Sequence, residues 1–201
     1  MALTRLGPNQ SVNLATNTTG TLGVANGGTG LTSGTSGQIL KFTGSTTLAS
    51  AAGGKVAQVV QNVITSGNTA SSSTSFAATS HLVAITPSAT SSNILLSFSF
   101  HQGTQTNNRY PQFRIYRDIG GAGYSHLTNG VDGEPHEQGG TYQNAGGQVT
   151  TQCSLDFYDD PGTTSQCTYK VYMAMQDTTG TVNIYGEAGI YGYHTASEIL
   201  A

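Results

Sequence analysis

The stretch Asn93–Phe100, NILLSFSF, shows a clear alternation of apolar and polar residues. Its large apolar side chains alternate with serine, so that Leu96, Phe98 and Phe100 fall on one face of an extended chain and the serines between them fall on the other. Alternation with a period of two is the pattern of a β-strand with one buried and one solvated face. The stretch therefore predicts a strand of an antiparallel sheet that covers a hydrophobic core.

Segments of the same kind lie on both sides of this stretch. They are residues 55–64 (KVAQVVQNVI), 81–87 (HLVAITP), 112–118 (QFRIYRD), 148–157 (QVTTQCSLDF), 166–175 (QCTYKVYMAM), 181–194 (TVNIYGEAGIYGYH) and 197–201 (SEILA). Residues 66–80 predict a polar loop or a weak edge strand. We count eight or nine strands at the spacing expected for a β-sandwich or a jelly roll.

Two connections in this pattern carry further predictions. The turn residues DDPGTT at 159–164 separate two strongly alternating segments, so we predict an antiparallel hairpin of residues 148–157 and 166–175. Residues 120–147 are rich in glycine and interrupt the alternation. They form either a pair of loops around a short strand or one exposed insertion, and loops of this length are usually functional or mobile.

Composition supports an all-β protein. Charged residues make up only 8% of the 201 residues, whereas Gly, Ser, Thr, Asn and Gln are abundant. Residues 1–117 contain six bases and no acid, and residues 118–201 contain ten acids and one base, which gives formal charges of +6 and −9. This asymmetry is either chance or a sign of contact between regions or subunits. Six scattered bases do not make a nucleic-acid surface.

The segment before the β-rich region has a different composition. Ten of the 27 glycines fall in residues 20–54, a stretch whose only charge is Lys41. Such a segment is too poor in apolar surface to order itself. It nevertheless carries spaced apolar residues, for which we predict contacts with other chains: Leu22, Val24, Leu31, Ile39, Leu40 and Phe42. We therefore divide the chain into an extended assembly arm, residues 1–54, and a β-sandwich domain, residues 55–201.

The two cysteines and the ends of the chain suggest where the protein is made. Cys153 and Cys167 both fall on the apolar faces of their predicted strands. They are either a cross-strand disulfide or two buried thiols, and synthesis in a cytoplasm favours the thiols. Residues 1–10 do not resemble a signal peptide, and no stretch approaches the ~20 apolar residues of a membrane helix.

Catalytic signatures are absent from the sequence, which predicts a protein that is not an enzyme and carries no cofactor. The acidic stretch Asp132–Glu137, which includes His136, is either a loop tip or a metal site, and the loop tip is the better interpretation. Asp159 and Asp160 precede Pro161 and fit turn chemistry. His81 and His101 lie at the expected ends of strands and are interpreted as structural.

Tyrosine is the other notable residue type, because ten tyrosines occur without any tryptophan. Tyr191 and Tyr193 lie near the C-terminal loops. Rigid amphipathic rings near loops suit the recognition of sugars or proteins, although tyrosine is equally at home in strands. The candidates for receptor contact are Tyr110, Tyr124, His126 and Tyr142.

The stretch GTLGVANGGTGLTSGTSGQILKFTGSTTLAS, residues 20–50, resembles connector segments in tail-fibre and appendage proteins of tailed bacteriophages. Those segments contain VANGGTG-type repeats followed by a GQ-L-x-F-x-G-type unit. The later segments ITPSATSSNILLSFSF, FRIYRD, SLDFYDDPGTTSQCTYKVYM and TASEIL resemble β domains of virion proteins from cyanobacterial and marine phages. The resemblance implies a homotrimeric protein of the virion surface, made in the host cytoplasm, with a jelly-roll-like C-terminal domain.

Three functions follow from this resemblance and from the composition. In the first, the protein is a tail fibre: the arm docks on a tail or adaptor protein, and the β domain contacts a host glycan or protein. In the second, it is a capsid decoration protein whose arm lies across the major capsid protein. The third is a small polysaccharide-degrading enzyme. We expect the first, with no nucleic acid or membrane as a partner.

Overall fold

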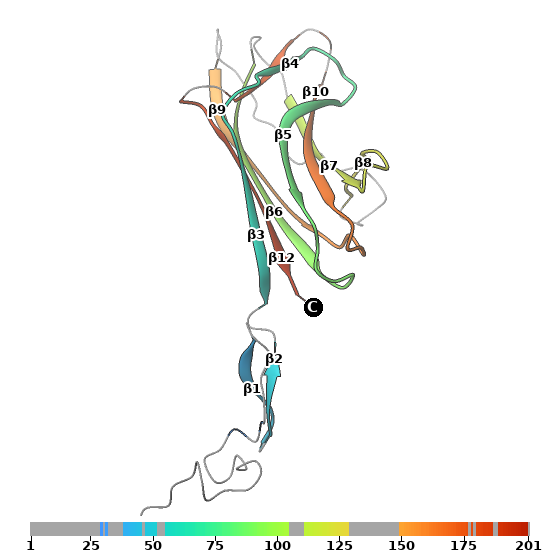
Figure 1. Cartoon of the computed structure of the whole chain (residues 1–201). Helices are drawn as coiled ribbons and strands as arrows, with labels where there is room; N and C mark the ends of the chain where they lie inside the picture. The colour runs from blue at the N-terminus through green and yellow to red at the C-terminus, as the bar shows by residue number, and fades with distance from the viewer. Residues whose placement is uncertain are drawn as a thin grey trace, which may run out of the picture. The chain divides into compact units, whose positions relative to one another are not determined.

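The computed structural model describes residues 29, 31, 38–45, 47–51, 55–104, 111–128, 149–176, 178, 180–186 and 189–200. The chain divides into two units, Met1–Gly54 and Lys55–Ala201, which are described separately. The described residues form strands and no helix (Figure 1). The all-β prediction is therefore confirmed for this part of the chain.

In the first unit, a two-stranded hairpin is formed by β1 (Ile39–Gly44) and β2 (Thr47–Ala51). Phe42 pairs with Leu48 and Leu40 pairs with Ser50, with a register irregularity between Phe42 and Gly44. The backbone groups of these residues of the predicted arm therefore pair with each other within the chain. Leu31 is half-buried, whereas Leu22 and Val24 lie outside the described residues.

The second unit contains two antiparallel sheets. The larger sheet runs β3 (Val56–Ile64), β12 (Gly192–Ile199), β6 (Asn93–Thr104), with β9 (Val149–Asp159) paired to β6. The short strands β11 (Val182–Tyr185) and β4 (Thr69–Ser71) extend this sheet beside β6. The smaller sheet runs β5 (Ala77–Ile85), β10 (Cys167–Met175), β7 (Pro111–Ile119), β8 (Ser125–His126). Among the described residues, these short strands raise the total above the expected eight or nine.

Four antiparallel pairings in this unit are nested. β3 pairs with β12, β5 with β10, β6 with β9 and β7 with β8. The chain therefore resembles one long hairpin, β7–β8 at its tip and β3–β12 at its open end. Pairing of β12 with β6 and of β10 with β7 then gathers the nested pairs into two sheets (Figure 1).

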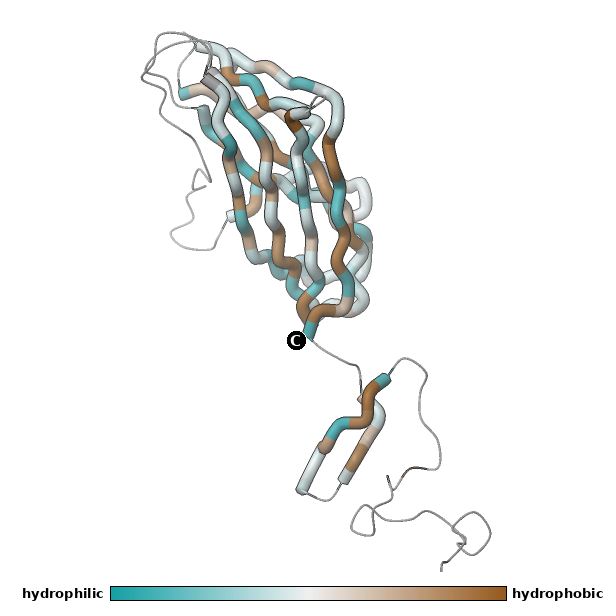
Figure 2. The backbone as a smooth tube through the Cα atoms, turned by 90° about the vertical axis from the view of Figure 1, so that its left-hand side faces the viewer, coloured by the Kyte–Doolittle hydropathy of each residue, from teal (hydrophilic) through white to brown (hydrophobic). Residues whose placement is uncertain are grey.

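The inward faces of both sheets supply one core, and the alternation of apolar and polar residues is visible along the strands in Figure 2. Leu96, Phe98 and Phe100 are fully buried, and Leu95 on the other face of β6 is 46% exposed. Phe113 and Ile115, which alternate with polar residues in the predicted strand of residues 112–118, are also fully buried. A one-residue slip of any of these strands would turn its apolar side chains out to water, so burial fixes the register.

The predicted hairpin of residues 148–157 and 166–175 is wrong. β9 pairs with β6 over Val149–Asp159, and β10 lies between β5 and β7 in the other sheet. Residues 160–166 therefore cross from one sheet to the other. Both strands turn their apolar faces inward, but they do so from opposite sides of the core, and Cys153 and Cys167 are buried free thiols.

Two further details differ from the sequence-based expectations. His81 lies in the middle of β5 instead of at its end, and it is fully buried. Residues 66–80 contain both the edge strand β4 and the start of β5. At the C-terminus, the N–H of Leu200 donates to the carbonyl of Lys55 at 2.7 Å, which holds the end of the chain against the start of this unit.

Candidate functional site

Aromatic side chains gather on the outer face of the smaller sheet. The rings of Tyr116 and Tyr172 are stacked with centroids 4.0 Å apart. Tyr124 lies 5.9 Å from Tyr172, and His126 lies 5.2 Å from Tyr116. All four side chains are half-buried. We call this cluster, together with Lys170 and Arg114, the aromatic face.

Strand register brings these residues together. Tyr116 of β7 pairs with His126 of β8 on one side and with Lys170 of β10 on the other. Two residues along the same strands, Arg114 of β7 pairs with Tyr172 of β10. Directly paired residues lie on the same face of a sheet, so the outward positions of three strands meet here.

A glycine-rich turn positions Tyr124 beside the sheet. Gly120, Gly121 and Gly123 have φ between 61° and 109°, a region that residues with a side chain rarely adopt. The N–H of Gly123 donates to Oδ1 of Asp118 at 2.8 Å. The turn thus fixes the backbone immediately before Tyr124 and occupies one oxygen of the Asp118 carboxylate.

The aromatic face carries positive charge. Nζ of Lys170 lies 4.7 Å from the centroid of the Tyr124 ring, and Cζ of Arg114 lies 3.9 Å from the centroid of Phe76. Both are cation–π distances. Burial, and secondly the charge of Arg114, lower the pKa of His126 below its usual value, so its imidazole is neutral at pH 7.

The structure thus brings two of the four predicted contact residues, Tyr124 and His126, into one cluster. Tyr110 and Tyr142 lie outside the described residues. Tyr116 falls in the predicted strand of residues 112–118, on the face opposite Phe113 and Ile115, but nothing in the sequence connects it to this site. Tyr172 was missed, although the period of two in residues 166–175 puts it opposite the inward-facing Tyr169 and Val171.

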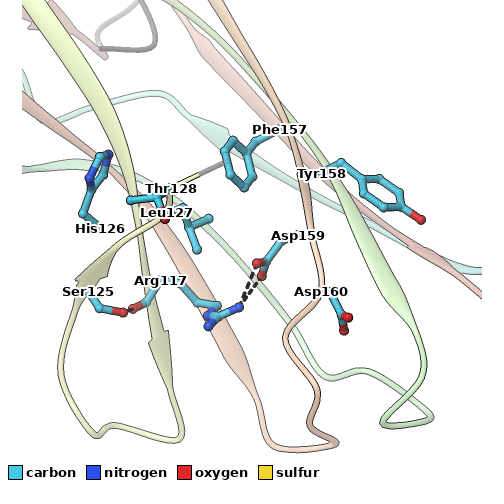
Figure 3. Close-up of a pocket in the computed structure, with 9 residues that line it drawn as sticks. All are labelled: Arg117, Ser125, His126, Leu127, Thr128, Phe157, Tyr158, Asp159 and Asp160. Carbon is cyan, nitrogen blue, oxygen red and sulfur yellow. Dashed lines mark hydrogen bonds and ion pairs between the residues drawn. The ribbon is translucent and has the colours of Figure 1, made fainter. Parts of the chain in front are cut away.

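A pocket of about 420 Å³ lies near the His126 end of β8 (Figure 3). Its lining includes Ser125 and Leu127 from the β8 region and Phe157 and Asp159 from β9. In Figure 3, the side chains of Arg117 and Asp159 point toward each other and are joined by dashed lines, and Tyr158 points away from them.

Asp159 is the centre of a buried polar network. Nη1 of Arg117 donates to both carboxylate oxygens of Asp159, at 2.7 and 2.8 Å, and the hydroxyl of Tyr169 donates to Oδ2 at 2.7 Å. Burial and the neighbouring carboxylate raise the pKa of Tyr169. The prediction that Asp159 only shapes a turn is therefore wrong, because its side chain joins strands β7, β9 and β10.

A second buried polar pair lies between the two sheets. Nδ1 of His81 and Nε2 of His194 are 2.9 Å apart, and both side chains are fully buried. Phe98 and Phe100 lie against the two rings. A Cβ on Gly192 would stand 2.7 Å from the His81 ring, so the pair requires glycine at this position.

Among the described residues, no group of three or more His, Cys, Asp or Glu side chains is placed to hold a metal ion. The stretch Asp132–Glu137, for which a metal site was the alternative interpretation, lies outside those residues. In the same described part of the chain, no helix is long and apolar enough to cross a membrane.

No protein-family model matches the chain, and no curated protein is similar to it. Among solved structures, it is similar to the infectious bursal disease virus VP2 subviral particle, with 12% identity and a TM-score of 0.38 over 80% of this chain and 41% of that chain. It is also similar to the structure of the infectious bursal disease virus Gx strain, with 12% identity and a TM-score of 0.36 over 82% and 42%. The chain thus spans about two fifths of the length of these proteins. A likeness this distant leaves function to be argued from the chain itself.

Proposed function

We propose that the protein is a structural component of a tailed-bacteriophage virion, a tail fibre whose arm docks on the tail and whose β domain is displayed for host attachment. The observation that carries the proposal is that the chain contains two structurally different units. A small hairpin unit with exposed apolar side chains precedes a separate β unit with a well-packed core. The phage-like composition of residues 20–50 supports the same function.

The hairpin is suited to assembly because its apolar residues are uncovered. Leu40 and Phe42 are 52% and 65% exposed, and Leu48 pairs with Phe42 on the same face. An isolated two-stranded hairpin is at best marginally stable in water. Burial of this apolar strip against another virion protein would stabilise both the hairpin and its interface with that protein, by about 25 cal/mol for each Å² of apolar surface buried.

We further propose that the β unit is a jelly roll. Its four nested pairings, β3–β12, β5–β10, β6–β9 and β7–β8, are those of a long hairpin rolled into two sheets. Such a unit exposes connections at both ends and a sheet face on each side. We propose a homotrimer, because several copies of a weak binding site give firm attachment through avidity.

Deletion of residues 1–54 tests the docking role. The expected result is a β domain that still folds but no longer enters phage particles. Its thermal unfolding should match that of residues 55–201 in the full chain. Incorporation of the truncated chain would contradict the proposal. Quantitative gels of purified particles then separate two positions on the virion, since a fibre occurs in a few dozen copies or fewer. Hundreds of copies would favour the alternative, a capsid decoration protein.

We propose binding without catalysis. The most deeply placed carboxylate of the pocket, Asp159, is engaged by Arg117 and Tyr169. A glycosidase of the usual kind needs two carboxyl groups flanking the bond that it cleaves. Incubation of the protein with host polysaccharide should release no reducing ends. Release that is lost in Asp159→Asn or Asp160→Asn would establish the enzymatic alternative.

A further inference from the structure

We propose that the aromatic face binds an acidic glycan, with a sugar ring packed on the tyrosines and its carboxylate or another anionic group paired with Lys170. This inference rests on the proposed attachment function, because it names the class of ligand that the displayed domain would recognise.

The first argument is the geometry of the rings. The four rings form a chain of neighbours whose centroids lie between 4.0 and 5.9 Å apart, in the order His126, Tyr116, Tyr172 and Tyr124. Because the rings are half-buried and hold each other in place, binding costs little side-chain entropy. Tyrosine side chains combine apolar ring surface with a hydroxyl group, which match the C–H faces and hydroxyls of a pyranose.

The second argument is charge. Lys170 lies over the Tyr124 ring and forms no ion pair with a carboxylate among the described residues. Arg114 adds a second positive charge to the face, and the pKa of His126 is lowered partly by it. Burial raises the pKa of Tyr172, and the negative charge of Asp118, which lies on the same face, helps to raise it. Lys170 and Arg114 outnumber this acid on the described face, so its net charge is positive and attracts an anion.

The third argument is the contrast with the larger sheet. The described outward positions of β6, β9 and β12 include the exposed Leu95, Tyr158 and Tyr193, with Asp156 as an acid and no lysine or arginine. The other outward residues are mostly uncharged and polar: Ser97, Ser99, Gln152, Ser154, Thr195 and Ser197. An acidic polymer would therefore be directed to one side of the domain. Two cations are few for a nucleic acid, whose binding depends on many phosphate contacts.

The experiment compares matched polymers on the full chain. Binding to polygalacturonate is measured by biolayer interferometry, with fully methyl-esterified pectin as the neutral counterpart and oligothymidylate as a different polyanion. We expect binding to polygalacturonate that weakens as salt is raised from low to moderate concentration. Equal binding to the neutral polymer, or no binding to polygalacturonate, would overturn the inference. Tighter binding to oligothymidylate would replace the glycan with a nucleic acid.

Variants locate the site. Lys170→Gln should weaken binding about tenfold, the size of one charge-assisted contact, and Lys170→Arg should restore most of it. Tyr124→Ala should weaken it several-fold. The controls Lys55→Gln and Tyr193→Ala, which alter a lysine and an exposed tyrosine away from this face, should leave the Kd unchanged. Equal losses in the controls would contradict the assignment, and unchanged thermal unfolding shows that each variant is folded.

A separate measurement keeps the two proposals apart. Mass spectrometry and immunogold labelling of purified particles show whether the chain is a virion protein, independently of glycan binding. A chain that is present in the particle but does not bind polygalacturonate refutes only the ligand. A chain that binds polygalacturonate through Lys170 but is absent from particles refutes the virion function.

Discussion

The carboxylate of Asp159 connects two side chains from different strands, Arg117 of β7 and Tyr169 of β10. Arg117 is 20% exposed and Asp159 is 7% exposed at the side chain. The pair also joins the basic first part of the sequence to its acidic second part. This ion pair is an example of contact between the two regions, which is one of the two explanations of the charge asymmetry.

Asp159→Asn should lower the free energy of unfolding by about 3 kcal/mol, because it leaves the guanidinium of Arg117 without its counter-charge in a largely buried site. Tyr169→Phe removes one hydrogen bond to a charged group and should cost about 1.5 kcal/mol. Urea denaturation measures both. Asp160→Asn, next to Asp159 but exposed, is the matched control and should change stability by less than about 0.5 kcal/mol.

The buried pair His81–His194 predicts a dependence of stability on pH. Burial lowers the pKa of His81 to about 4, and burial together with the neighbouring His81 lowers the pKa of His194 to about 3. The unfolded chain binds protons on these residues near pH 6.5, whereas the folded chain does not. Their stabilising contribution is therefore complete above pH 6.5 and is lost as the pH falls from 6.5 toward 4.

Urea denaturation between pH 7.5 and 4.5 should show little change above pH 6.5 and, below it, a loss that approaches about 1.4 kcal/mol per pH unit for each of the two histidines. In His194→Gln the slope should be about half as steep. A flat profile in the wild-type protein would contradict the burial of two neutral imidazoles. Glu198 affects stability only at lower pH, because hydrogen bonds, chiefly from Ser88, lower the pKa of its carboxyl group to about 2.

At the scale of elements, the β1–β2 hairpin has two unequal faces. Leu40, Phe42 and Leu48 share one face, whereas the other carries Lys41 with Ala49 and the exposed Ile39 with Ala51. The face of Leu40, Phe42 and Leu48 is uncharged and the more apolar of the two, so we expect a partner protein to cover this strip. The alternation of side chains in a strand makes this distinction testable by neighbouring substitutions.

Phe42→Asp should abolish incorporation into particles, because it places a charge in the middle of the apolar strip. Lys41→Asp, the adjacent residue on the opposite face, should leave incorporation within about twofold of the wild-type level, since an exposed charge change costs little. The measurement is the amount of protein in purified particles from complementation with each variant. Similar losses in both variants would show that the hairpin does not dock through this face.

At the scale of the molecule, a row of exposed side chains crosses the larger sheet. Val59 of β3 is 61% exposed, Leu95 of β6 is 46% exposed and Tyr158 of β9 is 58% exposed. Strand pairing aligns them, with Ser197 of β12 between Val59 and Leu95. Because β3 is also an edge strand of the sheet, this row is the surface that we expect other copies to cover in the proposed trimer.

Analytical ultracentrifugation at micromolar concentration should give a trimer for the full chain. The double variant Val59→Lys and Leu95→Lys should shift it toward monomer, whereas Gln61→Lys, one step farther along the outward face of β3, should have a smaller effect. A wild-type monomer would contradict the trimer. A trimer that is insensitive to the double variant would move the interface away from this row.

Local patterns in the sequence determined the all-β class and the buried face of individual strands. The alternation in Asn93–Phe100 and in residues 166–175 predicted the buried residues Phe98, Phe100 and Tyr169 correctly, because a period of two is a property of the extended backbone itself. The same pattern could not predict which strands are neighbours, and the hairpin expected between residues 148–157 and 166–175 does not form.

Strand neighbours are decided by the packing of the whole chain. The contact of His81 with His194 joins residues that are distant in the sequence. The pairing of Tyr116 with His126, and the crossing of residues 160–166 between the sheets, depend on turns whose paths the sequence does not specify. The alternation of residues thus predicts which side chains turn inward. Which of these side chains meet depends on how the two apolar sheet faces cover each other in the folded chain.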